Sequence, residues 1–587
     1  MNFLGIPFLL ALSFTGNAWA VRPGGDWFTL HTPRFRVHHT TDQSEFARAF
    51  ARHLEDHFDP LTRDLGWTPP TPIDIVVNDR SDLPNGLAES FPANRMEVQP
   101  VPFETESPLM DYYDWVEELA VHELAHLVAN DGATGFFRTL KGIFGTAIRP
   151  NGLQPAWIVE GLAVFEETRL TPGGRGRSVF SEALLRTAHL HEKLESNDYL
   201  LLERFNDGVF WWPHGNTRYV LGYAIQATLE RSRDEIANMP KHAHAGQSVP
   251  GLVSIGATRR FPYALNGNLE QITGKEWPDV WKETQKLLEL RYGNPSEKKE
   301  ECRLTKAGRF TGGHALGQDG MLYFSVDHPR TGRALARMRA DSPCLAAESA
   351  SRHSPENETE NFEVLKSGLR RSSSAKISLS PDGKQLVYSE IGFGKDSRES
   401  YDLMILDLKT KEVKQATKGL RARDPSFTPD GKELLFISQA KDGRASVLAM
   451  PVEGGDTREI YRAKIFERLS APVSSGENVY FSRHNNRGQE EILVANLRGD
   501  SDARALIPNF GKGTSFTERH PFPLPDGTVY FVATYDSFRP DFSGIRHEVY
   551  AWKPGAPRPS RLTETNSGLS FWPLPTTGNQ VIVANYG

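Results

Sequence analysis

The chain has 587 residues, of which 38% are hydrophobic and 24% are charged, and its formal net charge at pH 7 is −6. This composition is typical of soluble globular protein and argues against a disordered chain or a membrane-embedded bundle. The length is too great for one hydrophobic core, so two or more domains are expected. A net charge this small for the length gives no support for a nucleic-acid partner.

The N-terminus has the pattern of a secretory signal peptide. Residues 2–20 carry no charge, and residues 3–14 form an apolar stretch too short to span a bilayer comfortably. Ala18-Trp19-Ala20 supplies small residues at the positions that a signal peptidase reads, so we expect residues 1–20 to be removed by cleavage before Val21. No Lys or Arg precedes the apolar stretch, and an uncleaved anchor is the alternative. We expect export to the periplasm or the cell exterior.

Residues 21–295 are predicted to form one domain of mixed α and β structure. Runs rich in β-branched and aromatic residues predict strands at residues 27–30, 35–38, 73–77 and 95–99. Apolar residues at helical spacing predict helices at residues 44–65, 112–130, 155–168, 178–195, 217–232 and 276–291.

Residues 300–587 are predicted to form an all-β propeller. A turn followed by an alternating strand recurs at Gln318-Asp319-Gly320, Pro381-Asp382-Gly383, Pro429-Asp430-Gly431, Ser475-Gly476, Pro525-Asp526-Gly527 and Thr577-Gly578. The turn glycines are spaced by 63, 48, 45, 51 and 51 residues, which suits a four-stranded blade. Six turns therefore predict six blades.

In its Ser-Pro-Asp-Gly-Lys turn and in its length, this half resembles the TolB-like propellers. Residues 302–305 resemble the blade-closing segment 560–563, so we expect the start of the propeller to close its last blade. The two cysteines of the chain, Cys302 and Cys344, are expected to form a disulfide if the protein is exported.

The strongest motif for chemistry is His122-Glu123-Leu124-Ala125-His126. Two histidines at positions i and i+4 of a helix project from one face, so both imidazoles can bind one zinc ion. Glu123 would lie beside them as a base for water. A pair of core histidines is the alternative.

A third ligand is expected on the next helix. Glu160 lies within the apolar run 155–163, where an acidic residue is costly unless it is paired or bound to metal. A carboxylate that interacts with the helix dipole is the alternative for Glu160. Glu166 and Glu167 lie near the expected end of this helix, where we expect them to be solvated.

The segments Trp157-x-x-Glu160-Gly161-x-Ala163 and Tyr219-x-x-Gly222 extend this pattern. Together with the two-histidine motif, they resemble the signatures of the gluzincin zinc peptidases, the clan that includes aminopeptidase N and thermolysin. The resemblance covers roughly residues 25–290. It implies one zinc ion per chain held by His122, His126 and Glu160. It also implies hydrolysis of peptide bonds by zinc-activated water, with Glu123 as general base and Tyr219 stabilising the oxyanion.

Two departures from the aminopeptidase branch bear on specificity. That branch has a Gly-x-Met-Glu-Asn segment for the substrate's free amine, whereas this chain has Asn94-Arg95-Met96-Glu97-Val98, and Leu221 replaces a common lysine. We therefore expect an endopeptidase rather than an aminopeptidase, with strand 95–99 holding an extended peptide by edge pairing. A packed aromatic is the alternative for Tyr219, and His214 is an alternative oxyanion donor.

Two further hypotheses concern partners. The amphipathic stretch 135–144 could contact membrane, although we favour a mobile lid over the active site. The propeller could bind a substrate or a protein partner. The alternative function is a periplasmic binding or assembly scaffold in which the peptidase-like domain is catalytically silent.

Overall fold

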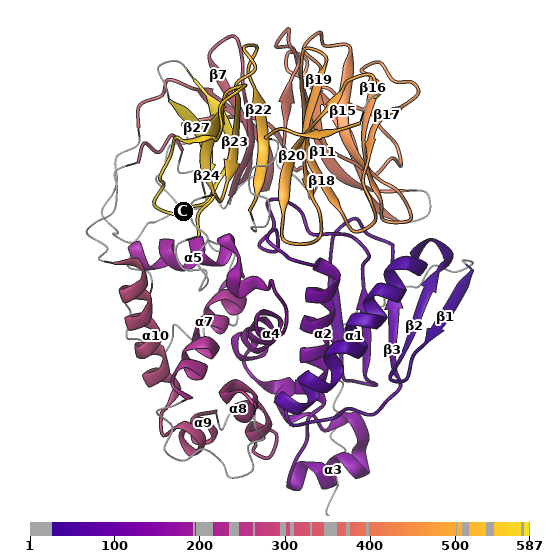
Figure 1. The fold of residues 1–587 in the computed structure, drawn as a ribbon, viewed down its shortest axis with the longest axis vertical. Coiled ribbons are helices and arrows are strands. Elements are labelled where there is room, and N and C mark those ends of the chain that lie inside the picture. Colours follow the sequence, from indigo (N-terminus) through magenta and orange to yellow (C-terminus); the bar gives the residue numbers. More distant parts are fainter. Residues whose placement is uncertain are drawn as a thin grey trace, which may run out of the picture.

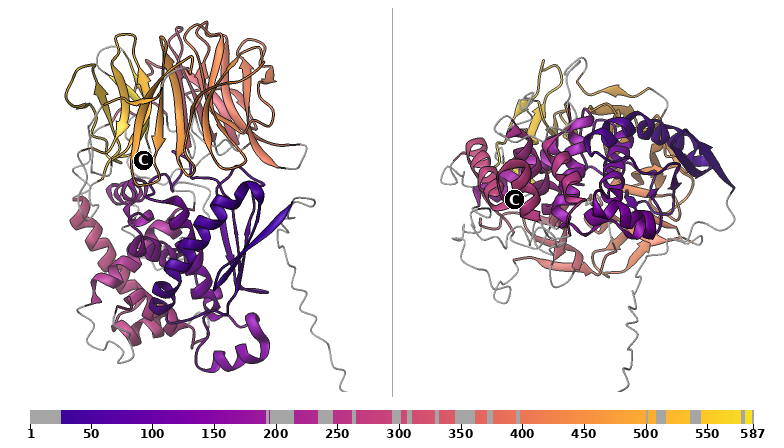
Figure 2. Two further views of the ribbon diagram at one scale, coloured as in Figure 1. Left: turned by 45° about the vertical axis from the view of Figure 1, so that its right-hand side comes forward. Right: turned by 90° about the horizontal axis from the view of Figure 1, so that it is seen from below.

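The computed structural model describes residues 26–191, 194, 215–233, 246–261, 265–293, 301–305, 310–328, 332–344, 361–370, 376–394, 398–499, 502–507, 516–535, 545–576 and 580–585. The predicted signal peptide and His214 lie outside these residues. The propeller caps one end of the molecule, and the N-terminal sheet and the helices form the other (Figures 1 and 2).

The N-terminal part contains one five-stranded sheet. Its strands follow the order β1 (Trp27–His31), β2 (Phe35–Thr40), β3 (Ile73–Val77), β5 (Arg95–Val98) and β4 (Gly86–Glu89). The pairs β2–β3 and β3–β5 are parallel, whereas β4 runs antiparallel to β5. The expectation that strand 95–99 offers a free edge is therefore wrong, because β5 lies between β3 and β4. The edge strands are β1 and β4, and β4 is the edge next to β5; no sequence pattern predicts β4 as a strand.

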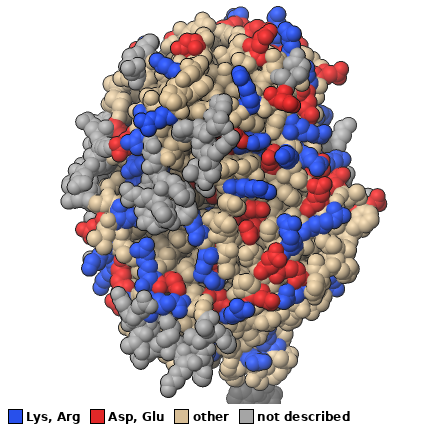
Figure 3. Space-filling model, in the orientation of Figure 1, with Lys and Arg blue, Asp and Glu red and all other residues tan. Residues whose placement is uncertain are grey.

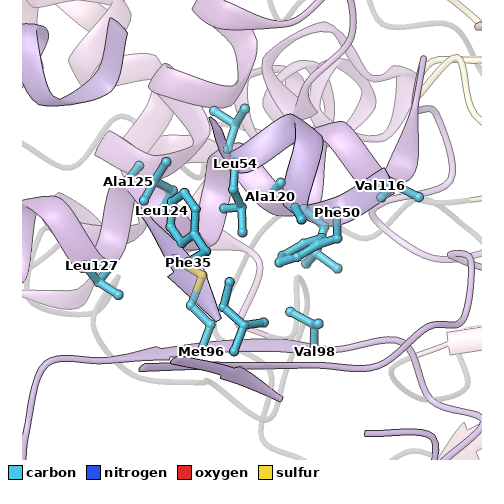
Figure 4. Packing of buried hydrophobic residues seen from close by; sticks show 14 of the residues in the cluster. Phe35, Phe50, Leu54, Met96, Val98, Val116, Ala120, Leu124, Ala125 and Leu127 are labelled. Carbon is cyan, nitrogen blue, oxygen red and sulfur yellow. The ribbon is translucent and has the colours of Figure 1, made fainter. Parts of the chain in front are cut away.

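Two helices cover this sheet, α1 (Ser44–Asp64) and α2 (Trp115–Asp131). Alternate residues of β2 are buried, as the period of two requires for a strand with one covered face. Phe35 and Met96 from the strands pack with Phe50 and Leu54 of α1 and Leu124 of α2 (Figure 4). This core fixes the position of α2, the helix that carries the two-histidine motif.

Six of the remaining helices form a second core. They are α4 (Ala156–Leu170), α5 (Val179–Leu190), α7 (Thr217–Arg231), α8 (Val249–Ala257), α9 (Leu265–Thr273) and α10 (Trp277–Tyr292); α3 (Phe136–Phe144) lies outside this core. Side chains from α4, α5, α7, α8, α9 and α10 share one buried cluster, which also includes Phe571 and Leu569 of the propeller. The helices are thus packed directly against the propeller.

Helix α3 departs from the expected role of a lid. It lies at the end of the molecule farthest from the propeller (Figure 1) and has no buried residue. Phe136, Ile143 and Phe144 are 62%, 68% and 60% exposed. None of its residues lines the cavity around the histidines, so the lid hypothesis is wrong for this structure. Membrane contact through this helix stays a prediction. No helix in the described ranges is both long and apolar enough to cross a membrane.

The propeller contains five complete four-stranded blades. They are β6–β9 (Phe310–Leu316, Met321–His328, Gly332–Arg339, Glu363–Ser367), β10–β13 (Ser378–Leu379, Gln385–Phe393, Glu399–Asp407, Val413–Gln415), β14–β17 (Ala422–Phe427, Glu433–Gln439, Ala445–Pro451, Arg458–Arg462), β18–β21 (Arg468–Ser475, Asn478–His484, Glu490–Asn496, Arg504–Ala505) and β22–β25 (Glu518–Pro523, Val529–Ala533, Glu548–Trp552, Ser560–Arg561).

The prediction of six blades is corrected to five. A two-stranded sheet of β26 (Ser570–Pro575) and β27 (Val581–Asn585) follows the fifth blade, and β26 contacts both β22 and β6. Residues 302–305 contain no strand that would complete this sheet, but Arg303 forms an isolated β-bridge and Leu304 packs in the cluster that contains Leu574. The sequence repeat reveals the turns, but it does not show how many strands pair after each turn.

The predicted disulfide is present, because Cys302 and Cys344 are bonded. In the five complete blades the repeated turn joins the first two strands, and Gly383 and Gly431 there have φ values of +71° and +70°. Such values strain most other residues, which explains why glycine recurs at this place.

Ion pairs, one of them buried, join the two halves of the chain. Arg398 Nη2 lies 2.7 Å from Asp79 Oδ1, and Arg421 Nε lies 2.6 Å from Asp82 Oδ1. Both aspartates belong to the loop that leads from β3 into the edge strand β4. The propeller therefore holds the loop before the sheet edge, a constraint that no sequence pattern reveals.

Candidate metal centre and active-site cavity

Helix α2 presents both histidines on one face. The helix begins after Asp114, whose side chain accepts hydrogen bonds from the backbone N–H groups of Val116 and Glu117. This N-cap satisfies two of the otherwise unpaired donors of the first turn. His122 is 6% exposed, and the Nε2 atoms of His122 and His126 lie 3.0 Å apart.

Helices α4 and α7 cross in close contact beside α2. A Cβ atom at Gly161 would lie 2.4 Å from the carbonyl carbon of Gly222, and a Cβ at Gly222 would lie 2.3 Å from the carbonyl oxygen of Trp157. Only glycine fits at both positions. The crossing places Glu160, one residue before Gly161, and Tyr219, three residues before Gly222, on the same cavity.

The three predicted ligands converge. Glu160 Oε2 lies 3.0 Å from His126 Nε2 and 3.6 Å from His122 Nε2. Tetrahedral zinc with ligands at about 2.0–2.1 Å separates its ligand atoms by roughly 3.3 Å. The observed separations agree with this value, so the residues fit a zinc ion. Burial alone would raise the pKa of Glu160, but the two histidines outweigh it and hold this pKa well below its usual range.

Glu123 is buried against the edge strand. Its side chain is so close to Gly86 that a Cβ atom there would lie 2.5 Å from Glu123 Oε1. Burial raises the pKa of Glu123 to about 7, and the charge of Glu160 acts in the same direction while His126 opposes it. A carboxyl group with a pKa near 7 is well matched to taking up and returning a proton at neutral pH. A bound cation would oppose part of this shift.

Glu167 and Arg175 are functional candidates that the sequence analysis missed. Glu166 and Glu167 were expected to be solvated, but they are 0% and 2% exposed. Arg175 donates to Glu167 Oε1 through Nε at 2.9 Å and to Oε2 through Nη2 at 2.9 Å. His122 Nδ1 lies 2.9 Å from the same Oε2. Glu167 therefore orients both the arginine and one predicted metal ligand.

A glycine-rich turn delivers Arg175 to this position. Gly174 has a φ of +93°, and a Cβ at Gly173 would lie 1.9 Å from Glu118 Oε1. A Cβ at Gly176 would collide with the ring of Tyr223 at 2.2 Å. The run Gly173-Gly174-Arg175-Gly176 is the one sequence signal that could have identified this residue.

Arg175 also bears on metal binding. Its Nη2 lies 3.0 Å from His122 Nε2, the atom that faces Glu160. A zinc ion bound to this Nε2 atom would lie close to the guanidinium group, and two cations close together repel each other. Nη2 also lies 2.5 Å from His122 Nδ1. We therefore expect both contacts between Arg175 and the His122 ring to open when metal binds, while the paired hydrogen bonds to Glu167 persist. His122 Nδ1 would then donate to Glu167, the common carboxylate–histidine support of a metal ligand.

Tyr219 lies at the same cavity. Its ring centroid is 6.4 Å from that of His122, and the guanidinium carbon of Arg175 lies 4.9 Å from the Tyr219 ring centroid. Burial raises the pKa of Tyr219, and the charge of Glu160 adds to this effect. The phenol therefore keeps its proton at neutral pH and can donate a hydrogen bond.

These groups line one cavity of about 300 Å³. Its walls include residues 84–88 of the edge strand and its approach, together with Phe103, Leu109 and Asp111. Asp111 Oδ1 is paired with Arg519 of the propeller at 2.7 Å. The structure thus brings all five predicted site residues to one cavity and adds Glu167 and Arg175. Through Arg519, the propeller stabilises the wall of the cavity that contains Asp111.

The substitution Glu167→Gln is expected to destabilise the metal-free protein in a pH-dependent way. Arg175 and His122 lower the pKa of Glu167 to about 2 although burial opposes them, so its charge stabilises the fold above the ordinary pKa of 4.5. Loss of one buried partner costs about 3–5 kcal/mol. This difference should be present at pH 7 and should vanish as the pH falls from 4.5 to 2.

Urea unfolding in the presence of chelator measures this difference. The control is Glu283→Gln, which removes an ion-pair partner of Lys275. The Glu283 side chain is 41% exposed. The control should cost less than about 1 kcal/mol. A cost for Glu167→Gln that is equal at pH 7 and pH 2.5 would contradict the assignment.

Comparisons with known proteins match only parts of the chain, and no family model matches it. The chain is 36% identical over 83 residues to the uncharacterized peptidase YuxL of Bacillus subtilis (strain 168), a match that covers 14% of this chain and 12% of that protein. The chain therefore matches only a small fraction of the length of this curated relative.

Two solved structures are similar to part of the chain. A putative TolB from Agrobacterium tumefaciens shares 17% identity over 43% of this chain and 80% of its own, with a TM-score of 0.32. A puromycin-hydrolyzing peptidase from Mycobacterium tuberculosis shares 17% identity over 44% of this chain and 38% of its own, with a TM-score of 0.29. The propeller fold rests on the strand order of the sheets.

Proposed function

We propose that the chain is an exported zinc-dependent endopeptidase whose catalytic domain spans residues 21–295 and whose propeller spans residues 300–587. The observation that carries this proposal is the convergence of His122, His126 and Glu160 at 3.0–3.6 Å, next to a buried glutamate. The local likeness to a protein named as a peptidase is consistent with hydrolysis of peptide bonds.

The proposed chemistry assigns one task to each side chain. When bound by the three ligands, zinc would supply a Lewis acid that acidifies water and polarises a carbonyl group. Glu123 accepts the proton of the attacking water and returns it to the leaving amine. Tyr219 donates a hydrogen bond to the oxygen that becomes negative, and Arg175 adds positive charge beside it.

The edge strand β4 supports an extended substrate. Its inner side pairs with β5, and no other strand of the described residues covers its outer side. Residues 84–88 also form one wall of the cavity. A peptide that adds to this edge as a strand would run past Glu123 and the three ligands. In this mode the strand binds the peptide backbone on both sides of the scissile bond, which favours cleavage of internal peptide bonds.

Export is part of the proposal. The bond between Cys302 and Cys344 is of a kind that persists in oxidising compartments.

On the face seen in Figure 3, basic and acidic side chains are interspersed, without a large patch of one sign. A peptide or protein substrate, and a protein partner on the propeller, stay the proposed partners.

Peptides that are blocked at both termini test endopeptidase action. We expect mass spectrometry to find internal cuts in a blocked peptide library, because no complete amine-binding segment precedes the motif. Stepwise removal of residues from free N-termini alone would identify an aminopeptidase instead. If the protein holds zinc but cuts neither the blocked peptides nor peptides with free N-termini, the scaffold hypothesis is favoured.

A further inference from the structure

A second group of potential metal ligands lies between helices α1 and α2. His53 and His57 are one turn apart on α1, and Glu117 lies in the first turn of α2. Each of the three can offer one ligand atom, and these atoms lie within 4.8 Å of one another. None of the three residues lines the cavity around His122, so the cluster is separate from the proposed active site.

The geometry of this cluster suits a metal ion. His57 Nε2 lies 2.8 Å from Glu117 Oε1, and His53 Nδ1 lies 4.0 Å from the same oxygen. The side chains are only 12%, 12% and 19% exposed. This burial lowers the dielectric around the carboxylate, which strengthens its attraction for a cation. An ion could still enter from solvent, because no member of the cluster is completely covered.

His53 has a binding capacity that the described contacts leave unused. Its Nε2 atom is buried and has no hydrogen-bond partner, and the Asp114 Oδ2 atom, at 3.7 Å, is too distant for one. A neutral imidazole keeps a lone pair on one ring nitrogen for a ligand. If Nδ1 bound a metal ion, Nε2 would carry the proton and face Asp114. A carboxylate in that position is the usual support of a metal-bound histidine.

We propose that His53, His57 and Glu117 bind a second divalent transition-metal ion, with zinc as the expected occupant. Two imidazoles and one carboxylate suit zinc, whereas magnesium and calcium prefer oxygen ligands alone. The ion would join α1 to the first turn of α2, five residues before His122. Its role would be structural, since it would fix the N-terminal end of the helix that carries the proposed catalytic residues.

Zinc titration of the full-length, metal-free protein by calorimetry tests this proposal. We expect two sites in the wild type, one in His122→Ala/His126→Ala and one in His53→Ala/His57→Ala. The variant with all four substitutions should bind none. The control is His38→Ala. His38 Nε2 lies 3.1 Å from Asp74 Oδ1, but His38 belongs to neither group of potential metal ligands among the described residues. It should keep two sites.

Two further measurements distinguish the loss of a metal site from misfolding of a variant. Glu117→Gln keeps the size of the side chain and should weaken the second site at least tenfold. Zinc should also raise the thermal midpoint of His122→Ala/His126→Ala, and this shift should disappear when His53 and His57 are also replaced.

The two proposals fail in different ways. If His122→Ala/His126→Ala binds no zinc while the wild type binds one ion, the second site is overturned and the proposed active site stands. If that variant binds zinc exactly as the wild type does, with one site in each, the second site stands and the proposed catalytic zinc fails.

Discussion

Glu123→Gln is expected to lower kcat for a blocked peptide by about 10²–10⁴-fold, the usual contribution of a general base. Glutamine has the size of glutamate but cannot accept the proton of water at neutral pH. None of the proposed zinc ligands is lost, so the zinc content should equal that of the wild type. Steady-state kinetics and metal analysis of the same preparation measure both effects.

His122→Ala is the matched comparison for this variant. It should also abolish activity, but through the loss of one zinc ion per chain. The two variants therefore fail for different reasons, which activity alone would not distinguish. If Glu123→Gln cleaves the peptide as fast as the wild type, Glu123 is not the base.

Gly86→Ala is expected to lower kcat/KM by about 10²-fold, the loss that a misplacement of about 1 Å causes in an active site. The added Cβ would lie 2.5 Å from Glu123 Oε1 and 2.8 Å from Leu119 Cδ1, so the carboxylate must move. The strand and its pairing with β5 should survive, because Gly86 does not have a positive φ. Circular dichroism should therefore match the wild type.

Gly142→Ala in α3 is the control for this substitution. A Cβ at Gly142 has no atom within 4 Å, so the same chemical change adds no collision. It should leave kcat/KM unchanged. Equal activity of both variants would show that the close approach of Gly86 does not position Glu123.

Local periodicity explains what the sequence could predict of the site. His122, Glu123 and His126 are neighbours on one helix, so their geometry follows from helical spacing alone. Glu160 can be predicted as a ligand because it is an acidic residue in an apolar run. Glu167 could not be assigned in this way, since its burial depends on Arg175, which arrives from a separate turn.

The same limit explains the errors in the fold. Strand β4 has the sequence Gly-Leu-Ala-Glu, which has little β propensity, and its place at the sheet edge is set by pairing with β5. Without β4, the sequence pattern leaves strand 95–99 as the edge. The amphipathic stretch 135–144 suggested a lid over the active site, but no sequence pattern shows that α3 lies away from the cavity. The repeated turns predicted a propeller, whereas the number of complete blades depends on strand pairing.

Removal and return of zinc tests the central claim most directly. The full-length protein is treated with a chelator, freed of it, and assayed on a blocked peptide before and after addition of zinc or magnesium. We predict that cleavage falls at least 100-fold without metal and that one to two equivalents of zinc restore it, whereas magnesium does not. Undiminished cleavage by protein that retains less than about a tenth of an equivalent of zinc would contradict the account.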